Sequence, residues 1–129
     1  MNRTPEETLR SYVSAFETLS PDAMVPFYLL PCMFIAPQGV TVVGDAGAAR
    51  ALASKLIEHA RSQGYKRTEI VDLQARRLSE SLASLSGVFV RLGAGGEEIG
   101  RFGFSYILVR GGEDWRITVA LAHEAPTPS

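Results

Sequence analysis

The sequence predicts an α+β fold, in which three N-terminal helices pack on a mainly antiparallel sheet. Two observations support this class. Residues 66–124 contain four long apolar segments separated by short turns at 79–81, 93–97 and 111–112, which is the pattern of an antiparallel meander. Before them, three helix-start signals are separated by two short strand-like segments. The expected order is therefore helix, helix, strand, strand, helix and then four strands.

The last hairpin gives the clearest evidence for the sheet. Gly111-Gly112 is typical of a two-residue turn, because glycine adopts the positive φ values that suit paired strands. This turn predicts one face made by cross-strand pairs, which are Leu108 with Trp115, Tyr106 with Ile117, Phe104 with Val119 and Phe102 with Leu121. The opposite face, with Ser105 and Thr118, is smaller and more mixed. We expect helices to cover one face and a partner subunit to cover the other.

Capping and proline signals predict the N-terminal elements. Thr4 is an N-cap followed by Pro5 and a capping-box glutamate, and the apolar spacing continues the helix to about Leu19. A second helix begins at Ser20 and stays short, ending near residue 28, because Pro26 limits its growth. Short strands at 32–36 and 40–43 precede a third helix that Asp45 caps and Gly64 ends. The final residues, 126–129, are expected to fray.

Composition limits the classes of function. The chain has 129 residues and a net charge of −1, which predicts one domain over 1–129 and gives no electrostatic reason to bind nucleic acid. The longest apolar stretch, 23–36, contains two prolines and is too short to span a membrane. A single cysteine, Cys32, and the lack of a signal-peptide segment favour the cytoplasm. Histidine and cysteine are too sparse for a metal site, and no cofactor motif is present.

Three local motifs accompany the predicted order of elements. They are a Tyr-Val-x-Ala-Phe run at 12–16, a Phe-x-x-Pro-x-Gly segment at 34–39 and a Gly-Gly-x-x-Trp-Arg-Ile segment at 111–117. Together they make the chain resemble the nuclear transport factor 2-like superfamily, which includes ketosteroid isomerase, scytalone dehydratase and the SnoaL-like polyketide cyclases. The resemblance implies a cone, with a bent sheet around the long helix, an apolar pocket inside and a homodimer packed through the sheet.

The resemblance to ketosteroid isomerase can be followed residue by residue. The tyrosine of that enzyme falls on Tyr12, but its general base falls on Ala36 and its protonated acid falls near Ser105. Because alanine cannot accept a proton, we reject ketosteroid isomerase activity. Scytalone dehydratase would need a histidine and aspartate pair, and His123 is the histidine that lies in the predicted sheet.

The two lines of reasoning place different faces of the sheet toward the pocket. The hairpin register makes the face with Phe104 and Tyr106 the natural core, whereas the resemblance turns the face with Ser105 and Thr118 toward the pocket. A β-bulge would exchange the faces along part of a strand. We favour the placement that the resemblance implies.

The candidate site follows from these arguments. Tyr12 and His123 are the candidate catalytic residues, and the candidate ligand-binding residues are Tyr28, Phe34, Leu56, Arg76, Ser105 and Thr118. Plainer roles are also open, with Tyr12 in the core and His123 closing the end of a strand. Arginine is present in the long strands at 76, 77, 91 and 101, and one that turned inward would suit an anionic or carbonyl-bearing ligand.

Two functions are therefore predicted as alternatives. The first is a small-molecule-binding cone, extending to a cofactor-free isomerase, dehydratase or cyclase that acts on an apolar carbonyl-bearing ligand. The second is a non-catalytic homodimeric module for binding or interaction. The alanine at position 36 favours the second, and an inward arginine in a deep pocket would favour the first.

Overall fold

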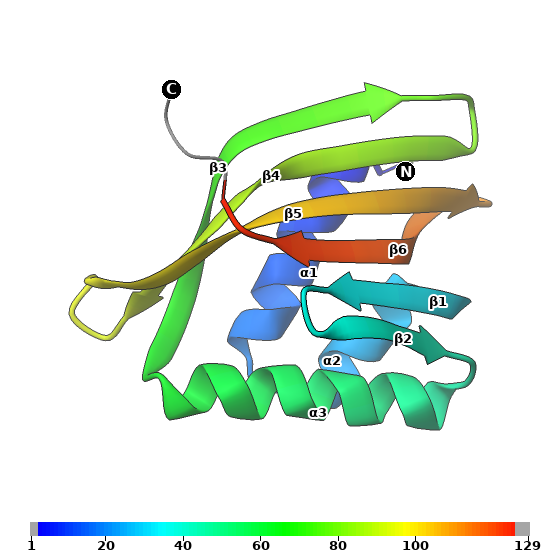
Figure 1. Ribbon diagram of the computed structural model, residues 1–129. Helices are drawn as coiled ribbons and strands as arrows, with labels where there is room; N and C mark the ends of the chain where they lie inside the picture. The colour runs from blue at the N-terminus through cyan, green and yellow to red at the C-terminus, as the bar shows by residue number, and fades with distance from the viewer. Residues whose placement is uncertain (1–2, 126–129) are drawn as a thin grey trace.

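The computed structural model describes residues 3–125 and contains the predicted order of helices and strands (Figure 1). The elements are α1 (Pro5–Glu17), α2 (Pro21–Met24), the 3-10 turn η1 (Val25–Phe27), β1 (Tyr28–Ala36), β2 (Gly39–Val43), α3 (Ala46–Ser62), β3 (Tyr65–Arg77), β4 (Leu82–Gly93), β5 (Glu98–Gly111) and β6 (Asp114–His123). The predicted fraying at 126–129 lies outside the described residues. None of the helices between residues 3 and 125 is both long and apolar enough to cross a membrane.

The helix boundaries follow the predicted capping signals. The Thr4 hydroxyl accepts the backbone N–H of Glu7, and the Glu7 carboxylate accepts the backbone N–H of Thr4, which forms a capping box. Asp45 caps α3 by accepting the N–H of Ala48, and Gly64 follows the helix with a φ of 78°. The second helix is shorter than predicted. It ends at Met24, because η1 follows it directly and β1 begins at Tyr28.

The sheet has six strands in the order β2-β1-β6-β5-β4-β3. Strands β3 to β6 form the predicted meander, whereas β1 pairs with β6 in parallel. Helix α1 packs against β3, β4 and β6, and α3 packs against β2 and β3. Figure 1 shows α1 behind the sheet and α3 along its lower edge, so that the sheet has an inner face toward the helices and an outer face.

The predicted register of the last hairpin is wrong by two residues. Gly111 pairs with Asp114, so that the turn contains Gly112 and Glu113 rather than the two glycines. A β-bulge follows, because Leu108 pairs with Ile117 whereas Ile107 pairs with Val119. Thr118 is the extra residue, and beyond it the side chains of β6 change faces. Tyr106 therefore pairs with Ala120, and Phe104 pairs with Ala122.

This bulge decides which face encloses the core. Phe104, Tyr106 and Leu108 lie on the inner face and are buried against the helices together with Trp115 and Ile117. Ala120 joins them, because the bulge returns it to the same face. The predicted core face is therefore correct for Phe104, Tyr106 and Leu108 on β5 but wrong for Val119 and Leu121, which lie on the outer face beyond the bulge. The favoured placement of Ser105 and Thr118 toward the pocket is wrong.

Candidate functional site

A cavity of about 430 Å³ lies against the inner face of the sheet, with walls from both long helices and from the strands β1, β3, β4, β5 and β6. Its apolar wall is made by Val13, Phe16, Phe34, Leu56, Phe89 and Phe102. Phe34 and Leu56 are thus brought together with Tyr12, as the sequence predicted. A cavity of this size and composition is typical of a small-molecule site.

Arg91 places a charged group in this aromatic wall. It follows Phe89 by two residues on β4, so that both side chains lie on the inner face. The guanidinium carbon of Arg91 is 5.1 Å from the ring centre of Phe16, 5.6 Å from that of Tyr65 and 5.0 Å from that of Phe102. These distances are those of cation–π contacts, which stabilise a partly buried cation. Burial lowers the pKa of Arg91 from its ordinary value, yet an arginine stays charged at neutral pH.

Two tyrosines add hydroxyl groups to the same cavity. Tyr12 and Tyr106 both line the wall, and their rings contact each other edge to face at 6.2 Å. Burial raises the pKa of each phenol well above its ordinary value, and the positive charge of Arg91 opposes this shift in both. The three polar side chains thus line one cavity.

Tyr28 supports this site from behind. Its hydroxyl is 2.6 Å from the Tyr12 hydroxyl in a buried hydrogen bond, but Tyr28 does not line the cavity. Its predicted contact with a ligand is thus replaced by a contact with Tyr12. Burial raises the pKa of Tyr28, so both phenols stay protonated at neutral pH.

Both histidines of the chain, His59 from α3 and His123 from β6, line the cavity. His123 is engaged on both ring nitrogens, with Nε2 at 3.1 Å from the Ser105 hydroxyl and Nδ1 at 2.9 Å from the Glu124 carbonyl oxygen. Ala36, the position of the isomerase base, also lines the cavity. Among residues 3–125, no three His, Cys, Asp or Glu side chains are grouped to hold a metal ion.

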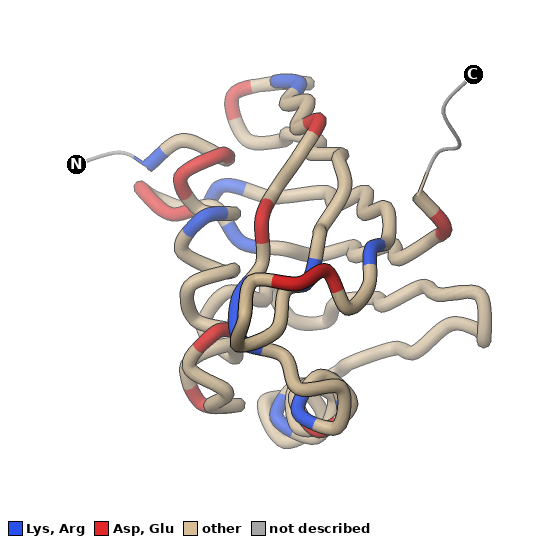
Figure 2. The backbone as a smooth tube through the Cα atoms, turned by 90° about the vertical axis from the view of Figure 1, so that its left-hand side faces the viewer, with Lys and Arg blue, Asp and Glu red and all other residues tan. Residues whose placement is uncertain are grey.

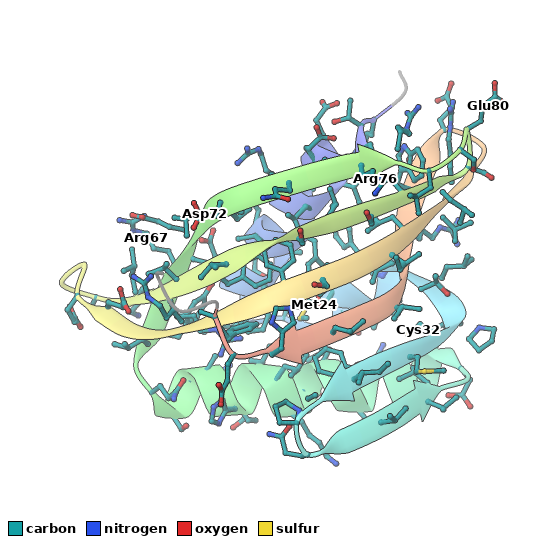
Figure 3. All side chains as sticks on the ribbon, turned by 45° about the horizontal axis from the view of Figure 1, so that its top comes forward. Met24, Cys32, Arg67, Asp72, Arg76 and Glu80 are labelled. Atoms are coloured by element: carbon teal, nitrogen blue, oxygen red, sulfur yellow. The ribbon has the colours of Figure 1, made fainter. Side chains whose placement is uncertain are left out.

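Three predicted ligand-binding residues lie elsewhere. Ser105 and Thr118 are on the outer face, because the bulge gives the inner face to their neighbours. There the Thr118 hydroxyl donates a hydrogen bond to the Pro31 carbonyl oxygen at 3.4 Å. Arg76 is exposed on β3, near the turn that carries Glu80 (Figure 3). It pairs with Ser84 on β4, whereas Arg91 pairs with Thr68 toward the other end of that strand pair.

The inward arginine is thus Arg91 rather than Arg76. The sequence signal that could have selected it is the alternation Leu85, Gly87, Phe89, Arg91 on β4, which leads from core residues directly to the arginine. The alternation is hard to see in the sequence, because the outer-face residues between these positions, Val88, Val90 and Leu92, are also apolar and buried. His59 was likewise missed, since the helical spacing places it beside the apolar stripe of α3 rather than in it.

The sequence profile of a family described as NTF2-like protein (DUF6841) matches residues 4–125. This chain belongs to that family. The NTF2-like relationship agrees with the fold above, and it confirms the resemblance inferred from the sequence. No functionally curated protein matches this NTF2-like chain.

Solved structures of low sequence identity share the fold of this NTF2-like protein. A protein of unknown function with a cystatin-like fold from Nostoc punctiforme PCC 73102 has a TM-score of 0.75 at 7% identity, covering 98% of this chain and 97% of its own. A second domain of unknown function from the same organism has a TM-score of 0.71 at 18% identity, with 93% and 74% coverage. An NTF2-like protein from Novosphingobium aromaticivorans has a TM-score of 0.70 at 12% identity, with 90% and 76% coverage.

Proposed function

We propose that this NTF2-like protein binds an apolar, carbonyl-bearing small molecule in the cavity beneath its sheet. The observation that carries the proposal is the Tyr106 hydroxyl, which lines the cavity and has no hydrogen-bond partner among residues 3–125. A hydrogen-bonding group left without a partner in an apolar wall is unfavourable, and a ligand oxygen would satisfy it. The Tyr12 hydroxyl, already bonded to Tyr28, lines the same wall and can orient the ligand.

Binding is better supported than catalysis. Proton transfer at a carbonyl compound needs a base within hydrogen-bond reach of the ligand. Ala36 supplies none, and both ring nitrogens of His123 already have partners. A cofactor-free isomerase, dehydratase or cyclase that used His123 as its base would have to break the contact between His123 and Ser105 before each turnover, and His59 is the other imidazole on the cavity wall.

The proposal is tested by the binding of a neutral ketone, 2-acetylnaphthalene, compared with 2-ethylnaphthalene, which has the same rings but no carbonyl group. We expect the wild-type protein to bind the ketone more tightly in equilibrium dialysis. Tyr106→Phe should lower the ratio of the two affinities by about 3- to 10-fold, which is the contribution of one neutral hydrogen bond. Retention of neither compound would overturn the proposal.

We also propose that the protein forms a homodimer through an outer patch on the sheet, defined as Met33, Ile35, Val40, Val42, Val119 and Leu121. Cross-strand pairing places these side chains on one face of β2, β1 and β6. Met33, Val40 and Val42 are 39%, 60% and 67% exposed. Residues 28–44 contain no charged side chain, which Figure 2 shows as an uncoloured hairpin, so two copies of the patch can face each other without repulsion.

We also propose the cellular compartment in which the protein acts. The one cysteine of the chain, Cys32, is a buried free thiol, and burial raises its pKa. Such a thiol is unreactive and suits a reducing environment, so we propose that the protein acts in the cytoplasm.

A further inference from the structure

Arg91 is a partly buried cation without a counter-charge. Among residues 3–125, no carboxylate forms an ion pair with it, and none of its guanidinium N–H groups has a hydrogen-bond acceptor. Glu124 also lines the cavity, but it forms no ion pair with Arg91. Glu17 accepts the backbone N–H of Thr68 at 3.0 Å, and Glu98 accepts two bonds from Arg101 at 2.9 and 2.7 Å.

An unpaired cation of this kind is costly in an apolar wall. A charged side chain that leaves water needs an opposite charge or several hydrogen bonds to compensate for its lost hydration. The rings of Phe16, Tyr65 and Phe102 compensate in part, but aromatic rings accept no strong hydrogen bond from the guanidinium edge. A ligand in the cavity can supply the remaining compensation in place of water.

The chemistry of the wall indicates the charge and shape of that molecule. A guanidinium presents its donors as a planar fork, which matches the two oxygens of a carboxylate. A dianion such as a phosphate monoester would keep an unneutralised charge, because Arg101, the other arginine on the wall, is bound to Glu98. The rest of the ligand meets mainly aromatic and aliphatic side chains, such as Phe34, Leu56 and Phe89.

We propose that Arg91 anchors the carboxylate of an apolar, aromatic monocarboxylic acid, and that this is the ligand class of the cavity. This inference rests on the proposed binding function and specifies its ligand. The fork of Arg91 pairs with both carboxylate oxygens, and the hydroxyl of Tyr106, which lines the same cavity, donates a further hydrogen bond to one of them.

The test compares 2-naphthoate with 2-acetylnaphthalene, which has nearly the same shape but no charge, by isothermal titration calorimetry. We expect the wild-type protein to bind the acid at least about tenfold more tightly, because a hydrogen bond to a charged group is stronger than a neutral one. Arg91→Met should abolish this preference and leave the affinity for the ketone within about threefold, since methionine retains the apolar stem.

Arg77→Met is the matched control, because it removes a strand arginine that also contacts an aromatic ring but does not line the cavity. It should leave the preference for the acid unchanged, and thermal unfolding should show that both variants are folded. Equal affinity of the wild-type protein for acid and ketone, or a preference that survives Arg91→Met, would overturn the inference while leaving the binding function in place. Failure of both compounds to bind the folded wild-type protein would overturn both proposals.

Discussion

Tyr106 carries a phenol that the fold keeps out of water. Burial raises its pKa well above the ordinary value of about 10, and the pKa values of Tyr12 and Tyr28 are raised in the same way. A group whose pKa is raised on folding binds its proton more tightly in the native state. Its contribution to stability is therefore complete below about pH 10 and is lost as the pH rises toward the native pKa.

We accordingly expect the free energy of unfolding to decrease above about pH 10, by up to about 1.4 kcal/mol per pH unit for each buried phenol. Tyr106→Phe removes one titrating group whose hydroxyl has no protein partner among residues 3–125, so the decrease should be less steep in this variant. Urea unfolding of both proteins between pH 8 and 11 measures the difference. If the free energy of unfolding of the two proteins decreased equally with pH, the burial of the Tyr106 phenol would be contradicted.

The arginines show what can and cannot be predicted at the scale of a residue. The sequence indicates that one of four strand arginines could turn inward, and the structure turns Arg91 toward the cavity. Arg77 also contacts an aromatic ring, with its guanidinium carbon 4.9 Å from the ring centre of Trp115, but it does not line the cavity. To choose between them, one must know which residues of each strand face the core. The pairing of β3 and β4 contains register shifts, which change that assignment along the strand.

At the scale of an element, β5 is crossed by the C-terminal segment that follows β6. The imidazole of His123 and the Glu124 carbonyl oxygen lie against Gly103, and a Cβ atom there would be 3.0 Å from that oxygen and would overlap the His123 ring. Figure 1 shows the chain turning away from the end of β6 across β5. Gly103 is therefore needed for close approach, and its φ is not positive.

This contact gives a prediction with an internal control. Gly103→Ala should reduce the free energy of unfolding by about 1–3 kcal/mol, because the added methyl group displaces His123 from Ser105. Gly100→Ala on the same strand should change it by less than about 0.5 kcal/mol, since nothing lies within 4 Å of its added methyl group. Chemical denaturation measures both, and equal effects would show that the crossing is not tightly packed.

Element boundaries were predicted better than strand pairing, and the reason is physical. Thr4 and Asp45 cap their helices through contacts with residues three positions away, so the signal is local in the sequence. The bulge at Thr118 depends on how β6 meets both β5 and β1, and no local pattern of residues specifies it. This step moved Val119 and Leu121 to the outer face, whereas the inward placement of Ser105 came from the family resemblance.

At the scale of the whole molecule, the proposed homodimer depends on the outer patch. If two copies pack through it, Val42→Glu places a charge at each of two symmetry-related positions in a buried interface. Each unpaired charge costs several kcal/mol, so dimerisation should weaken by at least about a hundredfold. Light scattering coupled to size exclusion should then report a monomer.

Leu78→Glu provides the control for this experiment. Leu78 is 50% exposed, as an apolar residue of the patch would be, but it lies beside the turn between β3 and β4. This variant should retain the mass of the wild-type protein. A wild-type monomer, or a Val42→Glu dimer as stable as wild type, would contradict a dimer formed through the patch.

The parallel pairing of β1 with β6 has a consequence for synthesis on the ribosome. The β1–β2 hairpin is completed at Val43, but its place in the sheet is beside residues 114–123. The hairpin leaves the exit tunnel about seventy residues before its neighbour and must wait without that sheet partner. Val40 and Val42 stay exposed on one face of its second strand, β2. A nascent chain stalled before β6 therefore presents an uncharged hairpin with an open edge, which makes it a substrate for chaperones that hold unfolded polypeptides.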